Sequence, residues 1–165
     1  MKRLPTLALF VALALAACSR QQAPELSPGD LTGQAAEDLV INEIMQNPAA
    51  VADSAGEWFE IYNAGSTGVD IDGWTIADNG IDSHVIANGG PLIVPAGGFF
   101  VLGNNGDTAT NGGVNVDYVY GGSFFLANGA DELVLSTAAG VEVDRVEWDG
   151  GPSFPDPNGA SMALE

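Results

Sequence analysis

The chain has 165 residues, 46% of them hydrophobic, and carries 22 acidic residues against four basic ones. Lys2 and Arg3 precede the single cysteine, Cys18, whereas every acidic residue follows it, so the chain from Cys18 onward has a formal charge of about −20. Because nucleic-acid affinity depends mainly on Lys and Arg, direct binding of DNA or RNA is disfavoured. The high apolar content predicts one folded domain rather than an acidic disordered chain.

The first residues have the pattern of an export signal. A short positive region precedes an apolar stretch over 4–17, which ends in small residues. This stretch is shorter than the ~20 residues of a transmembrane helix, so we interpret residues 1–17 as a signal peptide. The segment 15–18 (LAAC) also resembles the lipobox of bacterial lipoproteins, in which the cysteine is acylated and becomes the mature N-terminus. The alternative is an ordinary signal peptide cleaved near Ala17, with Cys18 left as a thiol.

Acylation of Cys18 sets expectations for chemistry and location. Since the chain has no other cysteine, the mature protein would lack thiol nucleophiles, disulfides and zinc-thiolate sites. Several acyl chains hold a protein on a membrane where a single chain is marginal. In the lipoproteins that this pattern resembles, a serine directly after the acylated cysteine is compatible with transfer from the inner membrane, and Ser19 occupies that position here. We therefore expect an exported, lipid-anchored protein of the cell envelope, at the outer membrane or cell surface.

Residues 18–38 predict a lipidated N-terminus followed by a flexible tether. The segment is polar, contains two prolines and two glycines, and shows no sustained apolar period. A chain of ~20 such residues has a root-mean-square reach of roughly 25 Å, enough to hold a domain clear of the headgroups. The alternative is a first strand or helix packed on the domain. The folded domain is expected over residues 39–165.

Turn signals and short strand-like runs dominate the remainder. Asn-Gly occurs six times and Asp-Gly twice, and both dipeptides favour turns with positive φ. No segment shows a helical apolar stripe with caps, so we predict a monomeric, all-β antiparallel sandwich. The expected strands, rich in β-branched and aromatic residues, are 39–45, 57–63, 74–77, 84–87, 99–102, 117–120, 124–126, 132–136 and 141–148.

Two of these runs also predict which residues face the core. In residues 57–63 (EWFEIYN), Phe59 and Ile61 alternate with Glu60 and aromatic residues, so one face is apolar and the other mixed. In residues 141–148 (VEVDRVEW) the apolar positions change parity midway. A β-bulge near Arg145 would explain that change.

Several segments, in this order and spacing, resemble the lamin tail domain family. They are VINEIM (40–45), GEWFEIYNAG (56–65), VDIDGWTIAD (69–78), IVPAGGFFVL (93–102), GADELVL (129–135) and VDRVEWDG (143–150). The resemblance implies an immunoglobulin-like antiparallel β-sandwich that tethers, positions or binds. It supplies no catalytic residue, and without a coiled-coil rod the filament-building activity of lamins does not transfer.

The sequence contains no recognisable catalytic constellation. His84 is the one histidine, so a zinc site with two histidines is excluded, and a Ser/His/Asp triad would depend on this residue alone. There is no nucleophile elbow, P-loop or dinucleotide-binding fingerprint. We interpret His84, in a strand-like run, as structural or surface-exposed, and expect a protein that is not an enzyme.

Acidic residues in Gly- and Asn-rich turns suggest weak calcium candidates. Asp70, Asp72, Asp78 and Asp82 provide the oxygen ligands that Ca²⁺ prefers, and Asp107, Asp149 and Asp156 lie in similar turns. An EF-hand is excluded, because the glycine and glutamate positions of that loop hold Ser83 and Gly89. The alternative is that these acids form turns and solubilise the surface. No other cofactor is expected.

Aromatic residues leave a further alternative open. They could line a platform for a protein or glycan ligand, or they could fill the core of the sandwich. The residues concerned are Trp58, Tyr62, Trp74 and Trp148.

These observations favour a membrane-anchored, non-enzymatic interaction or scaffolding module of the bacterial cell envelope. Its expected partners are the membrane, through the lipid, and a protein or glycan that the sequence does not identify. The alternative function is an accessory domain at the N-terminus of a larger secreted nuclease or phosphatase. An open reading frame downstream of Glu165 with clustered His, Asp and Asn would favour that alternative.

Overall fold

The computed structural model describes residues 36, 38–155 and 157–163. The predicted signal peptide, Cys18 and the predicted tether other than positions 36 and 38 lie outside the described residues. Ala36 is buried in the hydrophobic core, and the carbonyl oxygen of Asp38 accepts a hydrogen bond from the backbone N–H of Ala64 at 2.8 Å. Within the described residues no helix is long and apolar enough to cross a membrane.

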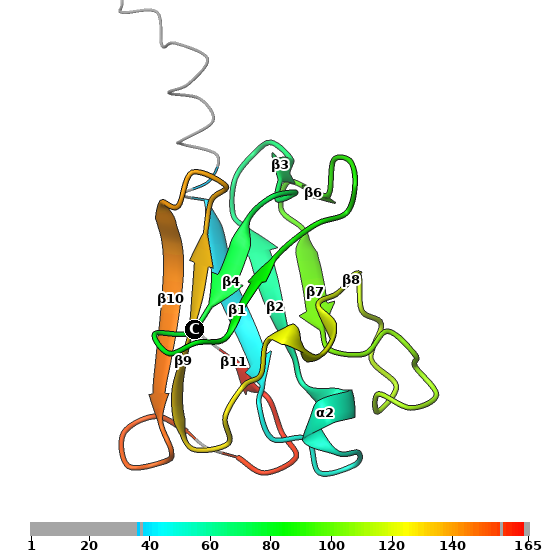
Figure 1. The fold of residues 1–165 in the computed structure, drawn as a ribbon, viewed down its shortest axis with the longest axis vertical. Helices are drawn as coiled ribbons and strands as arrows, with labels where there is room; N and C mark the ends of the chain where they lie inside the picture. Colours follow the sequence, from blue (N-terminus) through cyan, green and yellow to red (C-terminus); the bar gives the residue numbers. More distant parts are fainter. Residues whose placement is uncertain (1–35, 37, 156, 164–165) are drawn as a thin grey trace, which may run out of the picture.

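Two main sheets make up the domain, and a two-stranded ribbon extends it (Figure 1). The five-stranded sheet has the order β11 (Met162–Ala163), β1 (Leu39–Met45), β2 (Trp58–Asn63), β7 (Phe99–Gly103) and β8 (Tyr118–Val119). The four-stranded sheet has the order β10 (Glu142–Asp149), β9 (Ala130–Ser136), β4 (Thr75–Ala77) and β5 (Ser83–Val85). The ribbon pairs β3 (Val69–Asp70) with β6 (Ile93–Val94). Every pair is antiparallel except β7 with β8, which is parallel.

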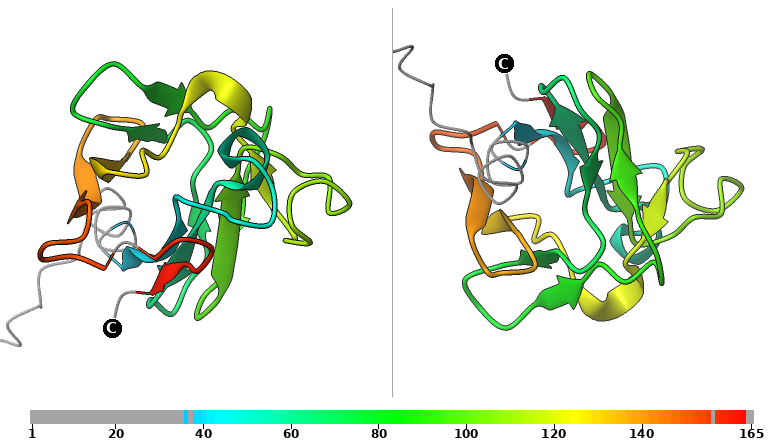
Figure 2. Two further views of the ribbon diagram at one scale, coloured as in Figure 1. Left: turned by 90° about the horizontal axis from the view of Figure 1, so that it is seen from below. Right: turned by 90° about the horizontal axis from the view of Figure 1, so that it is seen from above.

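The two main sheets lie as layers with the core between them (Figure 2). In β2 every second side chain points inward and has no exposed surface, and Leu133 and Leu135 of β9 are equally buried. The interior residues with no exposed surface include Phe59, Ile61, Ile76, Leu102, Leu133 and Leu135. This arrangement confirms the predicted all-β, immunoglobulin-like antiparallel sandwich.

The predicted strand faces are confirmed. Phe59 and Ile61 of β2 point into the core, while the intervening side chains are half-buried on the outer face. In β10 the register shifts between Glu142 and Asp144, next to the bulge position predicted near Arg145. Beyond this shift Trp148 is 3% exposed, because the added residue turns the following apolar side chains inward.

The structure corrects one predicted strand and adds short elements. Residues 124–126 are not a strand, because the N–H of Leu126 donates to the Glu57 carboxylate and that of Ala127 to Asp131 instead of to a sheet partner. Elements that the sequence pattern missed are β3, β6, β11, the one-turn helix α2 (Asp53–Gly56) and a 3-10 turn (Gly121–Ser123). Two to four residues are too few to establish a period.

Candidate interaction surface

An exposed apolar row crosses the outer face of the five-stranded sheet. Val40 of β1 pairs with Tyr62 of β2, which pairs in turn with Phe99 of β7. The three side chains share this face because each lies next to inward-pointing residues on its strand. Val40 is 39% and Phe99 55% exposed, and the rings of Tyr62 and Phe99 lie 4.7 Å apart. Apolar side chains that remain exposed together mark surfaces that bind partners.

The next row on this outer face is acidic. Glu43 pairs with Glu60, and Glu60 pairs with Val101. One oxygen of Glu60 accepts a hydrogen bond from Asn42 Nδ2 at 2.8 Å, and one oxygen of Glu43 accepts the hydroxyl of Ser161. Among the contacts of the described chain, the second oxygen of each carboxylate has no hydrogen-bond donor. Both side chains therefore retain a free acceptor on this face.

A second apolar row follows the acidic one. Met45 pairs with Trp58, and Trp58 pairs with Gly103. Val116 lies so close to Gly103 that a Cβ at that position would be 2.8 Å from a Val116 methyl group, so any larger residue there would displace Val116. The outer face of the five-stranded sheet consequently alternates an apolar, an acidic and an apolar row.

The structure divides the four aromatic residues considered for a ligand platform. Trp74 and Trp148 are 6% and 3% exposed and belong to the core. Trp58 and Tyr62 are half-buried on the outer face described above. The sequence pattern did not single out Val40 and Phe99, although alternation along each strand places them opposite the buried Ile41 and Phe100.

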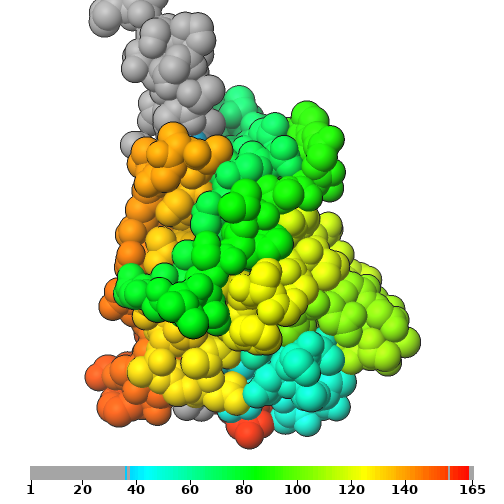
Figure 3. Space-filling model, viewed as in Figure 1, coloured from blue at the N-terminus to red at the C-terminus, as the bar shows by residue number. Residues whose placement is uncertain are grey.

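A second candidate region is an open cavity of about 510 Å³ on the four-stranded sheet. On the face drawn in Figure 3, loop 78–82 (green) lies against β9 (gold) and β10 (orange). Four carboxylates give this cavity a negative lining. The residues around it are Asp78, Asn79, Gly80, Ala130, Asp131, Glu132, Glu147 and Trp148.

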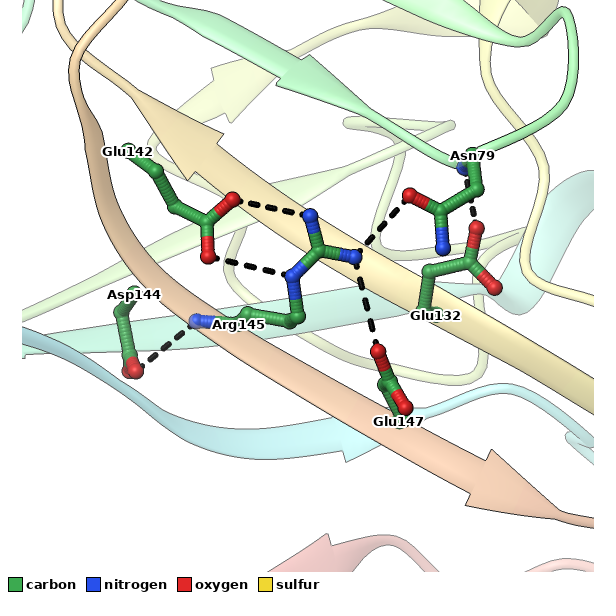
Figure 4. Close-up of polar contacts among 6 residues, drawn as sticks. All are labelled: Asn79, Glu132, Glu142, Asp144, Arg145 and Glu147. Carbon is green, nitrogen blue, oxygen red and sulfur yellow. Dashed lines mark hydrogen bonds and ion pairs between the residues drawn. The ribbon is translucent and has the colours of Figure 1, made fainter.

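Arg145 lies beside this cavity and is engaged by its neighbours (Figure 4). Its guanidinium makes two hydrogen bonds to Glu142, at 3.1 and 2.8 Å, and donates to Asn79 Oδ1 at 3.0 Å. An ion pair of 3.5 Å links it to Glu147. The bonds to Glu142 lower the pKa of that carboxyl and raise the pKa of Arg145. Since Arg145 is the one Lys or Arg within the described segments, no cation remains free there.

The four calcium candidates lie in two separate turns, and the carboxylates of three of them accept backbone hydrogen bonds. Asp70 Oδ1 accepts the N–H groups of Asp72 and Leu92, and Asp72 Oδ1 accepts that of Asn88. Asp78 Oδ1 accepts the N–H groups of Gly80 and Asp82, within its own turn. No three His, Cys, Asp or Glu side chains converge as a metal site within the described part of the chain. This geometry supports the interpretation of these acids as turn-forming residues.

His84 is held in a satisfied hydrogen-bond network. Its Nδ1 lies 2.7 Å from Ser123 Oγ and its Nε2 2.8 Å from the hydroxyl of Tyr118. The Ser123 hydroxyl donates to the carbonyl of Tyr120, so its proton is not directed at the histidine. Burial lowers the pKa of His84. The ring therefore links β5 to β8 and to the 3-10 turn, as expected for a structural residue, rather than activating a nucleophile.

Glu57 is an acidic residue buried inside the domain. It is 4% exposed, and its burial raises the pKa of the carboxyl to about 7, an effect that the neighbouring Asp53 and Asp131 reinforce. The bond from Leu126 N–H, at 3.2 Å, acts in the opposite direction. Glu57 does not line the cavity on the four-stranded sheet. It serves instead to hold the irregular segment after the 3-10 turn.

The fold and its surface define an immunoglobulin-like module with no catalytic constellation among the described residues. A family model, Lamin Tail Domain, matches residues 32–150, which is more than half of the chain. The chain therefore belongs to the lamin tail domain family, whose immunoglobulin-like domains bind rather than catalyse. A search of curated proteins found no match.

Proposed function

We propose that this protein is a lipid-anchored, non-enzymatic interaction module of the bacterial cell envelope. It is exported, acylated at Cys18 and held at the outer membrane or cell surface. It presents the outer face of its five-stranded sheet to a partner. The observation that carries the interaction proposal is the row Val40, Tyr62 and Phe99 on three paired strands, in which Val40 and Phe99 are exposed and Tyr62 is half-buried.

Membrane attachment rests on the LAAC pattern that ends at Cys18. Mass spectrometry of the mature N-terminus and detergent partitioning test it. The expected result is an acylated Cys18 in the detergent phase, and C18S should prevent both acylation and lipoprotein-type cleavage. An unmodified Cys18, or wild-type protein wholly in the aqueous phase, would contradict the anchor.

The interaction surface is tested in cells with a photo-crosslinking amino acid. Placed at Phe99, on the outer face, it should form discrete crosslinked species. Placed at Val85, which is 56% exposed on the opposite sheet, it should form far fewer. Equal crosslinking at both positions would show that the outer face is not a preferred surface.

The non-enzymatic assignment is supported by the arrangement around His84. The hydroxyl of Ser123 donates to a backbone carbonyl, and the second ring nitrogen is occupied by Tyr118. Incubation of the purified protein with DNA, phosphoester and glycan substrates should give no turnover. Turnover that H84A abolishes would refute the assignment.

A further inference from the structure

We propose that the outer face of the five-stranded sheet binds an extended polypeptide segment in which basic side chains stand between apolar ones. This inference rests on the proposed function and names the chemistry of the partner. The face is defined by its three rows, which contain Val40, Tyr62 and Phe99, then Glu43, Glu60 and Val101, then Met45 and Trp58.

The first argument is the spacing of the rows. Along β2, Tyr62, Glu60 and Trp58 follow one another at every second residue, so successive rows lie about 6.6 Å apart. An extended peptide also directs every second side chain to the same side, with the same spacing. A segment with the pattern apolar-x-basic-x-apolar, laid along β2, would therefore place its basic side chain on the acidic row and its apolar side chains on the two flanking rows.

The second argument is charge. Glu43 and Glu60 each keep one oxygen that accepts no hydrogen bond among the described contacts. No cation of the described segments can neutralise them, because Arg145 lies on the four-stranded sheet and is paired with Glu142 and Glu147. A guanidinium or ammonium group would supply the missing donors, and a ring such as Tyr62 beside it adds attraction for a cation.

Charge also favours this peptide over the other molecules that could bind an exposed apolar face. A second copy of the chain would bring four like-charged carboxylates together, with no cation on either face. An anionic lipid surface or a nucleic acid would meet the same repulsion. A neutral glycan could stack on Tyr62 and Phe99 but would leave the two carboxylates without a charged partner.

The experiment uses the purified full-length chain and a fluorescent nonapeptide of sequence Leu-Ser-Arg-Ser-Leu-Ser-Arg-Ser-Leu. Fluorescence anisotropy should show saturable binding that weakens as salt is raised, since charged contacts are screened. Replacing both arginines of the peptide by glutamate, or its leucines by serine, should each reduce affinity at least about tenfold, because both kinds of contact are needed.

Two variants of the protein address the two kinds of contact. E60Q keeps the shape of the side chain while removing its charge, and F99S removes exposed apolar surface; each should raise the Kd at least about fivefold. The matched controls on the four-stranded sheet, E147Q and V85S, should leave the Kd unchanged. Thermal unfolding of all four variants shows whether the fold is intact, and E60Q remains informative if F99S unfolds.

The outcomes distinguish the partner chemistry from the proposed function. Absence of peptide binding, or binding unaffected by E60Q and F99S, overturns the partner assignment. Self-association in sedimentation, or binding of a neutral glycan, that F99S abolishes assigns the face to those occupants instead. If any of these results accompanies preferential crosslinking at Phe99, the interaction module stands with another partner. Without that crosslinking, both proposals fail.

Discussion

The Glu57 carboxylate accepts a hydrogen bond from the backbone N–H of Leu126, 3.2 Å away and 69 positions later in the chain. Two further carboxylates hold the same segment: Asp131 accepts the N–H of Ala127 at 2.7 Å, and Asp53 accepts the side-chain amide of Asn128 at 2.9 Å. The segment that crosses from β8 to β9 is thus attached through ionisable side chains rather than through a sheet ladder.

Substituting Glu57 by glutamine should make stability less dependent on pH. The pKa of Glu57 is raised from 4.5 to about 7 in the folded state, so the folded protein binds the proton more tightly than the unfolded chain. Glu57 therefore destabilises the fold increasingly as pH rises from about 4.5 to 7, and the loss persists at higher pH. Relative to wild type, E57Q should gain about 3 kcal/mol at pH 8 and less than about 1 kcal/mol at pH 5.

Urea unfolding at the two pH values measures this difference. Glutamine retains an oxygen that can accept the Leu126 N–H, so the hydrogen bond is preserved in the variant. The matched control is E60Q in β2, whose side chain lies on the outer face and does not bind the Leu126 N–H. Parallel pH profiles for wild type and E57Q would contradict the assignment.

Phe124 and Phe125 are neighbours with opposite environments. Phe124 has no exposed surface and contacts the ring of Tyr120 edge-on at 5.8 Å, whereas Phe125 is 45% exposed. F124A should cost about 3–5 kcal/mol of unfolding free energy through the cavity it leaves, and F125A less than about 1 kcal/mol. Chemical denaturation measures both. Similar losses for the pair would show that segment 124–126 is not packed as described.

Asp144 links the two layers through the backbone of β1. Its Oδ2 accepts the N–H of Ile41, a residue that is 2% exposed, at 2.7 Å. D144A leaves that buried donor without its partner and should cost about 1–3 kcal/mol. Amide hydrogen exchange should accelerate at Ile41 in the variant. With E147A, on the same strand, the exchange rate of Ile41 should not change, and equal acceleration in both variants would argue against the link.

Calcium should have little effect on stability. The carboxylates of Asp70, Asp72 and Asp78 already accept backbone N–H groups, and they lie in two different turns. A ligand that binds only the folded state adds about 2.7 kcal/mol at 100 times its Kd, so a genuine site would raise the melting temperature measurably. Melting curves in millimolar calcium and in chelator should coincide. A higher transition in calcium, lost in D70N or D78N, would establish a site.

The class of fold follows from local patterns in the sequence. Alternation in EWFEIYN requires Phe59 and Ile61 to share a face, and that period belongs to a strand whatever its neighbours are. Frequent Asn-Gly and Asp-Gly turns imply many short connections, as observed. The change of parity in β10 likewise pointed to a bulge, because only an added residue turns Val146 and Trp148 to the core side.

The candidate surface was only partly predictable. Sequence placed Tyr62 on a mixed face, but it could not separate Trp58 from Trp148, since either can pack in a core or against solvent. Which of the two tryptophans is buried depends on which face of each sheet packs against the other sheet. The register between β1, β2 and β7 places Val40, Tyr62 and Phe99 in one row. This register is set by pairing between distant segments of the chain, which local sequence patterns do not show.

Tertiary structure alone decided the conformation of residues 124–126. Their composition favours a strand, and Phe124 and Leu126 are buried as a strand pattern would suggest. A strand, however, also needs a neighbouring backbone to pair with its N–H groups. Carboxylates from Glu57 and Asp131 accept two successive N–H groups here, at Leu126 and Ala127. The segment therefore remains irregular, because side chains, one of them 69 positions away, replace the backbone of a neighbouring strand.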